Sequence, residues 1–405
     1  MNKVMMLLRT QLVRLGNRVK PDKRIWLFSS TDNRHFTYNS RYLFLHVREN
    51  HPGIRPLFVI NDPVLREKLA EEYGQEYFIE TESPDGIKKA LSAGVWFTSA
   101  GLPVYGPRLK RNRLIINLWH GVPLKKIALL DPNEGALSRL YFRRIFSDNY
   151  TYILTTSDRL VPVMRRSFGV PEEVIKVWGQ PRNDELLAFR QKAVRDTADE
   201  SVQVQETLRK LCGGGLPPFK KAILYAPTFR DERSTRLFPF ADYDKASLEK
   251  YLEENQLLLF IRTHINEKEI AAPFLTDRVR FLGNEQVEDI TGSLYLFDLL
   301  VTDYSSIYID FLLLDRPEIF LPYDRAEYLA DRGMNFPYDK VTPGPKPETM
   351  EDFCRAVTDS LFGEDPYRKA RKRCSRFFNQ VTEPCCERIC REVLQKTGAE
   401  DERRN

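Results

Sequence analysis

The chain has 405 residues, of which 42% are hydrophobic and 12% aromatic, so it is long enough for about two or three domains with sizeable cores. Its 62 basic and 57 acidic residues give a formal net charge of +5, which is too mild to indicate a nucleic-acid-binding protein. The longest apolar runs, such as 4–8 and 257–261, fall far short of the roughly 20 residues that span a bilayer, and Arg9 and Arg14 break the first apolar region, so we expect neither a transmembrane helix nor a signal peptide.

Residues 1–22 predict a basic amphipathic helix. Apolar side chains recur there at helical steps of three and four, at Met5, Leu8, Leu12, Leu15 and Val19. Basic residues and no acidic residue occupy the positions between them up to residue 20. Two interpretations stay open: the helix lies on an anionic membrane surface, or it packs on its own domain or on a partner protein.

From residue 23 onward, short strand-like runs alternate with helical runs, which is the rhythm of a parallel sheet covered by helices. The predicted strands cover 24–29, 56–60, 95–99, 113–119, 152–156 and 174–179, and the predicted helices cover 42–49, 63–73, 87–93 and 159–168. A charged helical stretch then runs to residue 211. We therefore expect a first Rossmann-like domain over residues 23–211.

A second set of alternations follows the Gly- and Pro-rich segment 212–218, which is the best candidate for a linker. Its predicted strands cover 222–226, 257–262, 279–282, 298–302 and 318–321, and its predicted helices cover 243–255, 290–296 and 307–314. We expect a second Rossmann-like domain over 212–385, then a C-terminal helix and polar tail over 386–405. The predicted fold is α/β, with two doubly wound domains facing across a cleft and ligands beyond the carboxyl ends of the strands.

Six cysteines without an export signal indicate a reducing cytoplasm, where thiols stay free. Four lie in the C-terminal region: Cys374, Cys385, Cys386 and Cys390. They lack the CxxC spacing of a zinc site and no histidine is near them in the sequence, so we expect no metal there. Cys386 and Cys390 instead fit one face of a terminal helix as small apolar residues.

Two polar clusters follow predicted strands of the first domain. After 113–119 comes a loop with His120, Lys125 and Lys126. A lone histidine is more often structural, but in such a loop it can act as acid or base near neutral pH. After 174–179 come Arg182, Asn183 and Asp184, and the favoured interpretation of Asp184 is that it caps the helix that follows.

Three polar clusters follow predicted strands of the second domain. Their members are Arg230 after the first strand, Arg262 and His264 after the second, and Thr302, Asp303, Ser305 and Ser306 before a helix that starts near residue 307. A helix N-terminus attracts phosphate, whereas plain N-capping by one of the serines is the alternative. We favour phosphate, because the three basic residues converge on the same rim if the sheet is parallel.

The sequence lacks the GxxxxGK[ST], GxGxxG and HExxH motifs, so the usual NTPases, dinucleotide oxidoreductases and zinc proteases lose their main support. Five segments in order instead resemble the CDP-glycerol glycerophosphotransferase family, the teichoic acid primases and polymerases and their capsule-polymer relatives. These segments are WHGVPLKK at 119–126, GQPRNDEL at 179–186, ILYAPTFRD at 223–231, RTH at 262–264 and LLVTDYSSIYIDF at 299–311. The resemblance extends from about residue 23 to residue 393.

The resemblance implies a GT-B fold, a CDP-linked donor in the second domain, and a peripheral position on the inner face of the cell membrane. It also implies a reaction in which a hydroxyl of a lipid-linked saccharide or growing polymer attacks the β-phosphorus of CDP-glycerol, and CMP leaves. No metal-binding carboxylate cluster comparable to DxD stands in an obvious place, so we expect donor binding without a metal, and no cofactor beyond the co-substrate.

The resemblance assigns roles to the polar clusters. His120 would be the general base, and His264, the second catalytic histidine, would hold the diphosphate with Arg230, Arg262, Ser305 and Ser306. Thr302 and Asp303 would belong to the same donor site, although Asp303 is also placed to orient the loop. The acceptor side would contain Lys125, Lys126, Arg182, Asn183 and Asp184.

Two departures from the family pattern leave the alditol open between glycerol, ribitol and related compounds. Val122 stands where the family usually has threonine, and Ile265 where it usually has proline. Two alternatives also remain from the sequence: a GT-B glycosyltransferase that uses a nucleotide sugar, and an inactive, membrane-attached assembly subunit.

Overall fold

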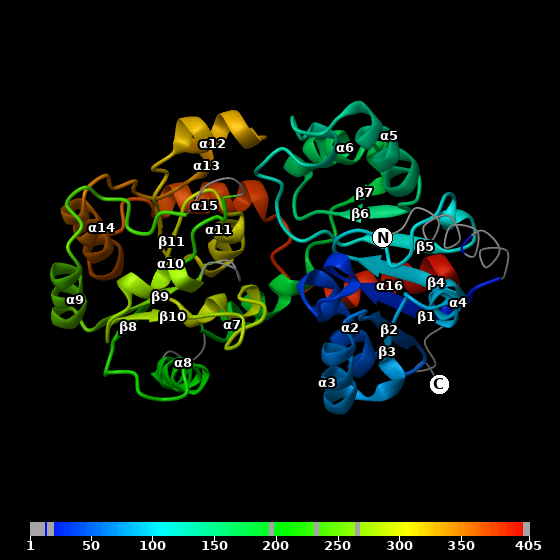
Figure 1. Cartoon of the computed structure of the whole chain (residues 1–405), viewed down its shortest axis with the longest axis horizontal. Helices are drawn as coiled ribbons and strands as arrows, with labels where there is room; N and C mark the ends of the chain where they lie inside the picture. Colours follow the sequence, from blue (N-terminus) through cyan, green and yellow to red (C-terminus); the bar gives the residue numbers. More distant parts are fainter. Residues whose placement is uncertain (1–12, 14–19, 194–197, 231–234, 264–267, 400–405) are drawn as a thin grey trace. The chain divides into compact units, whose positions relative to one another are not determined.

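The computed structural model describes residue 13 and residues 20–193, 198–230, 235–263 and 268–399 (Figure 1). Most of the helix expected over residues 1–22 lies outside these residues, and so does His264. The chain divides into two compact units. The first consists of Met1–Val122, Lys126–Asp184 and Glu383–Asn405, and the second of Pro123–Lys125 and Glu185–Thr382.

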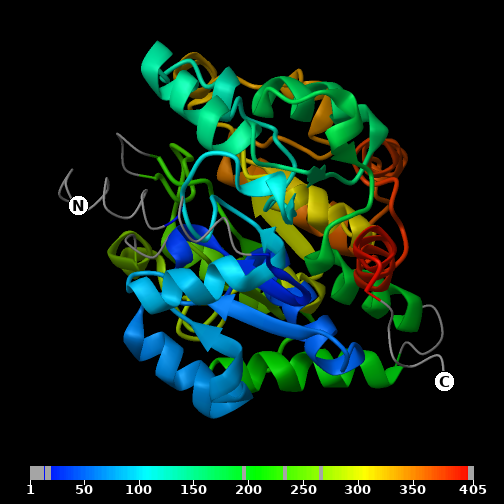
Figure 2. The same ribbon diagram turned by 90° about the vertical axis from the view of Figure 1, so that its right-hand side faces the viewer.

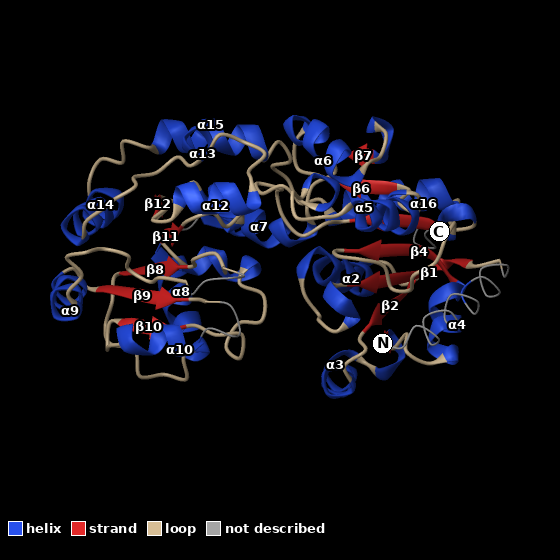
Figure 3. Cartoon of the chain, turned by 45° about the horizontal axis from the view of Figure 1, so that its top comes forward, coloured by secondary structure: helices blue, strands red, loops and turns tan. Residues whose placement is uncertain are grey.

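The first unit contains a seven-stranded parallel sheet in the order β3-β2-β1-β4-β5-β6-β7. Figure 1 labels these strands, and Figure 3 draws strands in red. Its strands are β1 (Asp22–Ser29), β2 (Arg55–Val59), β3 (Phe78–Ile79), β4 (Ala93–Thr98), β5 (Leu114–Asn117), β6 (Tyr152–Leu154) and β7 (Ile175–Lys176). β1 pairs with both β2 and β4, so the strand order reverses there. Doubly wound sheets bind ligands beyond such a reversal.

The described helices of this unit are α2 (Tyr38–Asn50), α3 (Pro63–Tyr73), α4 (Pro84–Ser92), α5 (Ala136–Phe142), α6 (Val161–Phe168) and α16 (Cys386–Thr397). Two of them, α3 and α4, begin at strong local signals. Asp62 accepts a hydrogen bond from the Leu65 amide at 2.9 Å, and Pro63 opens α3. Ser83 caps α4 in the same way, again before a proline.

The second unit contains a five-stranded parallel sheet in the order β10-β9-β8-β11-β12. Its strands are β8 (Lys221–Tyr225), β9 (Leu257–Ile261), β10 (Val279–Phe281), β11 (Leu299–Thr302) and β12 (Glu318–Phe320). Its helices are α7 (Asp184–Ala193), α8 (Ala198–Leu211), α9 (Lys245–Glu254), α10 (Lys268–Ala271), α11 (Ile307–Phe311), α12 (Arg325–Arg332), α13 (Tyr338–Val341), α14 (Met350–Phe362) and α15 (Arg368–Phe378). Every residue of β9 is fully buried, as is typical of a parallel sheet covered on both faces. The α/β class with two doubly wound units is thus confirmed.

The units divide at Asp184, whereas the sequence places the boundary after residue 211. Both α7 and α8 belong to the second unit. In Figure 2, α8 is the long green helix at the bottom of the view. Packing explains this, because the Phe189 ring lies 4.7 Å from the Tyr295 ring and Arg190 donates to the Leu313 carbonyl at 3.0 Å. α16 belongs to the first unit instead of forming a separate tail.

Other differences concern short or unusual elements. The helix expected over 290–296 is a 3-10 helix at Thr291–Leu296, and α5 and α12–α15 were not predicted. Within the described part of the chain, every helix is too short or too polar to cross a bilayer.

Candidate active site

Arg230 is the centre of a polar cluster at the carboxyl edge of the second sheet. It follows β8 and is 7% exposed. Its guanidinium lies 2.9 Å from Oδ2 of Asp303, and its Nε lies 2.8 Å from Oδ2 of Asp324. Burial opposes the charge of Arg230, but hydrogen bonds and attraction from the two carboxylates outweigh it and raise the guanidinium pKa above its ordinary value. One cation thus ties together the loops after β8, β11 and β12.

Asp303 organises two of these loops through its buried carboxylate. Its Oδ1 accepts from the backbone N–H of Thr228 at 2.8 Å and of Tyr304 at 2.6 Å. The hydroxyl of the neighbouring Thr302 donates to the Ala226 carbonyl at 2.7 Å. The side chains of Thr302 and Asp303 therefore hold the loop after β8 against the loop after β11. For Asp303, this is the orienting role that the sequence suggested.

Three tyrosine rings surround the Arg230 guanidinium. The ring centres of Tyr304, Tyr323 and Tyr328 lie 5.1, 5.3 and 5.1 Å from its Cζ. Tyr304 also stacks on Tyr328 at 3.9 Å and donates its hydroxyl to Asp324 at 3.0 Å. Aromatic faces attract cations and keep water away, which strengthens the ion pairs inside the cluster.

Lys125 brings another cation to this cluster. The Nζ atom of Lys125 lies 5.9 Å from the centre of the Tyr328 ring. The side-chain amide of Asn335 donates to the backbone carbonyl of Lys125 at 2.8 Å. Burial lowers the pKa of Lys125 to about 8, with the Arg332 charge acting in the same direction and Asp303 against it. An incoming anion favours the charged ammonium, so Lys125 is suited to bind a phosphate group.

Hydroxyl groups face the same edge of the sheet. Ser305 accepts weakly from the Ile307 amide at 3.4 Å, and Ser306 precedes α11 without a side-chain capping bond. The hydroxyl oxygens of Thr228 and Thr263 are buried and have no hydrogen-bond partner among the described residues. Buried polar atoms are normally hydrogen-bonded, so each of these hydroxyls can still bond a polar ligand that reaches it.

Arg262 follows β9 but bonds protein groups. Its NH2 group donates to Oδ1 of Asn284 at 2.7 Å, and its NH1 group donates to the carbonyls of Leu282 and Gly283 at 3.3 Å. Burial lowers its pKa to about 10. The described contacts give Arg262 a positioning role for the loop after β10. The anion clamp that it was expected to form with His264 stays a prediction, because that histidine lies outside the described residues.

His120 lies in the loop after β5 in the first unit. Its Nδ1 is 2.7 Å from the Ser99 carbonyl oxygen, so Nδ1 carries the proton and Nε2 keeps a lone pair. The rings of Trp119 and Tyr38 lie 4.0 and 5.3 Å away. Burial lowers the pKa of His120 to about 4, partly opposed by the Ser99 hydrogen bond and reinforced by the Arg182 charge. The imidazole is therefore neutral at pH 7 with one unprotonated nitrogen, but its pKa lies below the near-neutral value that the sequence led us to expect.

Asn39, which no sequence signal marked, supports the His120 loop from the second residue of α2. Its side-chain amide donates to the carbonyls of Leu118 and Trp119 at 3.2 and 2.7 Å, and its Oδ1 accepts from the Arg182 amide at 3.1 Å. Arg182 then donates to the His120 carbonyl at 2.8 Å. These partners of Asn39 are backbone groups at least 79 residues away in the sequence, so no local motif reveals them.

Asp184 caps a helix, but a different helix from the one expected. Its carboxylate accepts from the backbone N–H groups of Cys385 at 2.8 Å and Cys386 at 2.9 Å, at the start of α16 instead of α7. A negative charge is favourable at a helix N-terminus. Of the other residues expected on the acceptor side, Arg182 contacts the His120 loop, Lys126 is exposed and Asn183 is buried. Lys125, expected with them, belongs to the second unit and lies beside Tyr328 of the Arg230 cluster.

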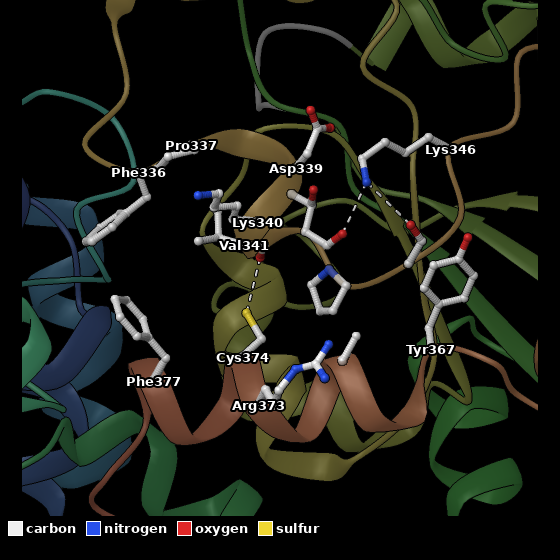
Figure 4. Close-up of a pocket in the computed structure, with 14 residues that line it drawn as sticks. Phe336, Pro337, Asp339, Lys340, Val341, Lys346, Tyr367, Arg373, Cys374 and Phe377 are labelled. Atoms are coloured by element: carbon white, nitrogen blue, oxygen red, sulfur yellow. Dashed lines mark hydrogen bonds between the residues drawn. The ribbon is translucent and has the colours of Figure 1, made fainter.

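A pocket of about 850 Å³ lies in the second unit between α13 and α15 (Figure 4). Its charged lining consists of Lys340, Lys346, Arg373 and Asp339, with aromatic rings at both ends of the view. The excess of cations suits an anionic ligand. Tyr338 of α13 connects this wall to the Arg230 cluster, because its hydroxyl donates to the Asp303 carbonyl at 2.8 Å.

Comparison with known proteins gives a consistent result. Residues 11–395 match the family described as CDP-Glycerol:Poly(glycerophosphate) glycerophosphotransferase. The chain is 27% identical over 369 residues to the teichoic acid poly(glycerol phosphate) polymerase of Bacillus subtilis (strain 168), covering 88% of this chain and 46% of the polymerase. It therefore spans about half the length of that relative.

Two further matches cover nearly the whole of both chains. The chain is 28% identical over 374 residues to the teichoic acid poly(glycerol phosphate) polymerase of Bacillus spizizenii, covering 88% of this chain and 90% of the relative. The solved structure of the wall teichoic acid polymerase TagF superposes with a TM-score of 0.75 at 21% identity, covering 98% of this chain and 96% of that one. The latter likeness supports the two-unit fold.

Proposed function

Because the chain belongs to the CDP-glycerol:poly(glycerophosphate) glycerophosphotransferase family, we propose that it transfers an alditol phosphate from a CDP-linked donor to a hydroxyl of a growing or lipid-linked polymer. Glycerol phosphate is the first choice of transferred group, CMP is the leaving product, and the polymer is of the teichoic acid or capsule type. The observation that carries the proposal is the family match over residues 11–395, which contains both the His120 loop and the loop at 299–311.

The second unit is the proposed donor site. Charge builds up on the transferred phosphoryl group and on the departing phosphate, so catalysis depends on fixed cations and hydrogen-bond donors. Lys125 and the hydroxyls of Ser305 and Ser306 supply such groups. Arg230 and Asp303 act as positioning residues, because their polar atoms already bond each other and the neighbouring loops.

The first unit is the proposed source of the general base. His120 donates Nδ1–H to the Ser99 carbonyl, so its Nε2 can remove the proton from the acceptor hydroxyl as that oxygen attacks phosphorus. The proton then resides on the imidazole until it passes to solvent. Arg182 supports this loop through the His120 carbonyl and belongs to the acceptor side by position.

A donor panel tests the proposed function against its two rivals. Purified protein with a lipid-linked or polymer acceptor is offered CDP-glycerol, CDP-ribitol and nucleotide sugars, and the products are read by mass spectrometry. We expect CMP and an acceptor heavier by one alditol phosphate. Release of a nucleoside diphosphate with sugar transfer would establish a glycosyltransferase, and a complete lack of turnover with every donor would support the assembly subunit.

A double substitution tests the proposed phosphate site. Changing Ser305→Ala and Ser306→Ala should weaken CDP-glycerol binding by about 1 to 3 kcal/mol, since hydrogen bonds to a charged group are lost. Calorimetry measures the affinity and thermal melting measures stability. Unchanged affinity with a marked loss of stability would instead assign these serines to helix capping.

We also propose that α5 touches an anionic membrane surface. Its Leu137 is 84% exposed, and Leu140 and Tyr141 are 54% and 43% exposed. The basic Arg139 and Arg143 are exposed beside them, a combination that suits an anionic lipid interface. Leu137→Ser with Leu140→Ser should reduce co-sedimentation with phosphatidylglycerol vesicles severalfold; equal sedimentation of parent and variant would dismiss the idea.

A further inference from the structure

Two histidines and a cysteine from opposite ends of the sequence meet in the first unit. His46 lies on α2, His51 directly follows α2, and Cys390 lies on α16. One ligand atom from each of these side chains lies within 4.8 Å of the other two. No histidine is near Cys390 in the sequence, but the packing of α16 against α2 brings two histidines close to it.

Glu387, one turn before Cys390 on α16, adds a carboxylate to the cluster. Its Oε2 lies 3.1 Å from Nε2 of His46 and 3.1 Å from Nε2 of His51. His51 is 3% exposed and Cys390 is fully buried, while His46 is partly exposed. Two imidazole nitrogens and one sulfur therefore share one small, mostly buried volume. The Glu387 carboxylate, whose side chain is 61% exposed, contacts both imidazoles from the surface.

This donor set is typical of tetrahedral zinc. Zinc binds imidazole nitrogen at about 2.0 to 2.1 Å, carboxylate oxygen at about 2.0 to 2.2 Å and thiolate sulfur at about 2.3 Å, which places neighbouring ligand atoms about 3.3 to 3.6 Å apart. The two contacts of Glu387 are close to that spacing. The ligand atoms of His46, His51 and Cys390 lie within 4.8 Å of one another and would have to draw closer when the ion binds. Magnesium and calcium prefer oxygen ligands, so sulfur and nitrogen argue against them.

We propose that His46, His51, Glu387 and Cys390 bind a zinc ion that fastens α16 to α2. Four protein ligands fill a tetrahedral shell, so the site is structural. The Cys390 thiol gives up its proton to solvent when the ion binds, because the thiolate is the ligand. The ion would also stabilise the helix that carries Asn39 and hence the support of the His120 loop.

The competing interpretation is a metal-free clasp in which the Glu387 carboxylate accepts from both imidazoles. Cys390 is then not a ligand, and its replacement by serine leaves the histidine contacts to Glu387 in place. The thiol at position 390 therefore separates the two interpretations.

Metal analysis of the full chain is the first test. The protein is exposed to zinc chloride, dialysed against zinc-free buffer and measured by plasma mass spectrometry. We expect roughly one zinc per chain in the parent and in the control Cys212→Ser, which lies in the other unit. Cys390→Ser and His51→Asn should each lower retained zinc by about tenfold or more. A parent without zinc, or variants that retain all of it, would overturn the proposal.

Cobalt substitution makes the result independent of how well the variants fold. Co²⁺ added to the chelator-treated parent should give the intense visible bands of a tetrahedral ion and a near-ultraviolet thiolate-to-cobalt charge-transfer band. The weak spectrum of six-coordinate cobalt would contradict the proposed ligands. Chelator treatment should also lower the Tm of the parent but not that of Cys390→Ser, whereas equal melting of the parent with and without chelator would support the metal-free clasp.

Discussion

Replacing His120 by alanine is expected to lower the rate of transfer by about 10² to 10⁴, the usual contribution of a general base. Donor affinity should stay near that of the parent, because His120 and the proposed donor site lie in different units. The experiment measures kcat from CMP release and the Kd of CDP-glycerol by calorimetry. The exposed His35→Ala is the matched control and should change neither value.

The pH profile sharpens this expectation. A general base works when it is unprotonated, and the pKa of about 4 keeps His120 neutral in the free enzyme at every pH well above 4. The acid limb of kcat/KM, which reports the free enzyme, should therefore fall near pH 4 and not near 6.5. If the acid limb is instead centred at pH 6.5 and disappears in the alanine variant, His120 is exposed to water and has an ordinary pKa. Near-normal transfer by His120→Ala would remove it from the mechanism.

Arg230→Met should destabilise the second unit by about 3 to 5 kcal/mol, because it leaves the carboxylates of Asp303 and Asp324 without their shared cation in a buried cluster. Transfer should be lost as well, since the loops after β8, β11 and β12 are no longer held together. Urea unfolding followed by circular dichroism measures the stability, and CMP release measures the activity.

The sequence offers both a control variant and a built-in reference for this measurement. Arg325 pairs with Asp339 at 2.6 Å, but the two side chains are 41% and 58% exposed, so Arg325→Met should cost at most about 1 kcal/mol. All four tryptophans lie in the first unit, at positions 26, 96, 119 and 178. Tryptophan fluorescence should therefore keep its parental midpoint while the dichroism shifts. Equal stability of Arg230→Met and Arg325→Met would refute the central role of Arg230.

The parallel sheets were predictable where local signals are strong. Helix α3 begins and ends at its predicted residues because Asp62, Pro63 and Gly74 mark both ends. The unbroken apolar run of β9 likewise indicated a strand buried on both faces. By contrast, β3 has two residues, and the helical run at 290–296 adopts a 3-10 form that its apolar spacing does not distinguish from an α-helix.

The sequence located the candidate site residues, because they come directly after predicted strands. It did not predict which residues they would bond. The assignment of Arg230 to the donor site stays a prediction. Its bond to Asp324, which is 94 residues further along the chain and belongs to none of the five segments, was not predicted. Asp184 was expected to cap the next helix, and it caps one that starts 202 residues later. Such pairs depend on how loops from different strands come together, which a single sequence does not encode locally.

The position of α16 has a consequence for the order of folding during synthesis. This helix completes the first unit through Asp184, His46 and His51, yet it follows the entire second unit in the chain. About 200 residues separate Asp184 from Glu383, so at roughly 5 to 20 residues per second a ribosome needs about 10 to 40 s to supply α16. The second unit can therefore close first although it is made later. An N-terminal fragment that ends at Asp184 would lack this helix, and expressing the first unit alone requires joining residues 383–405 to it.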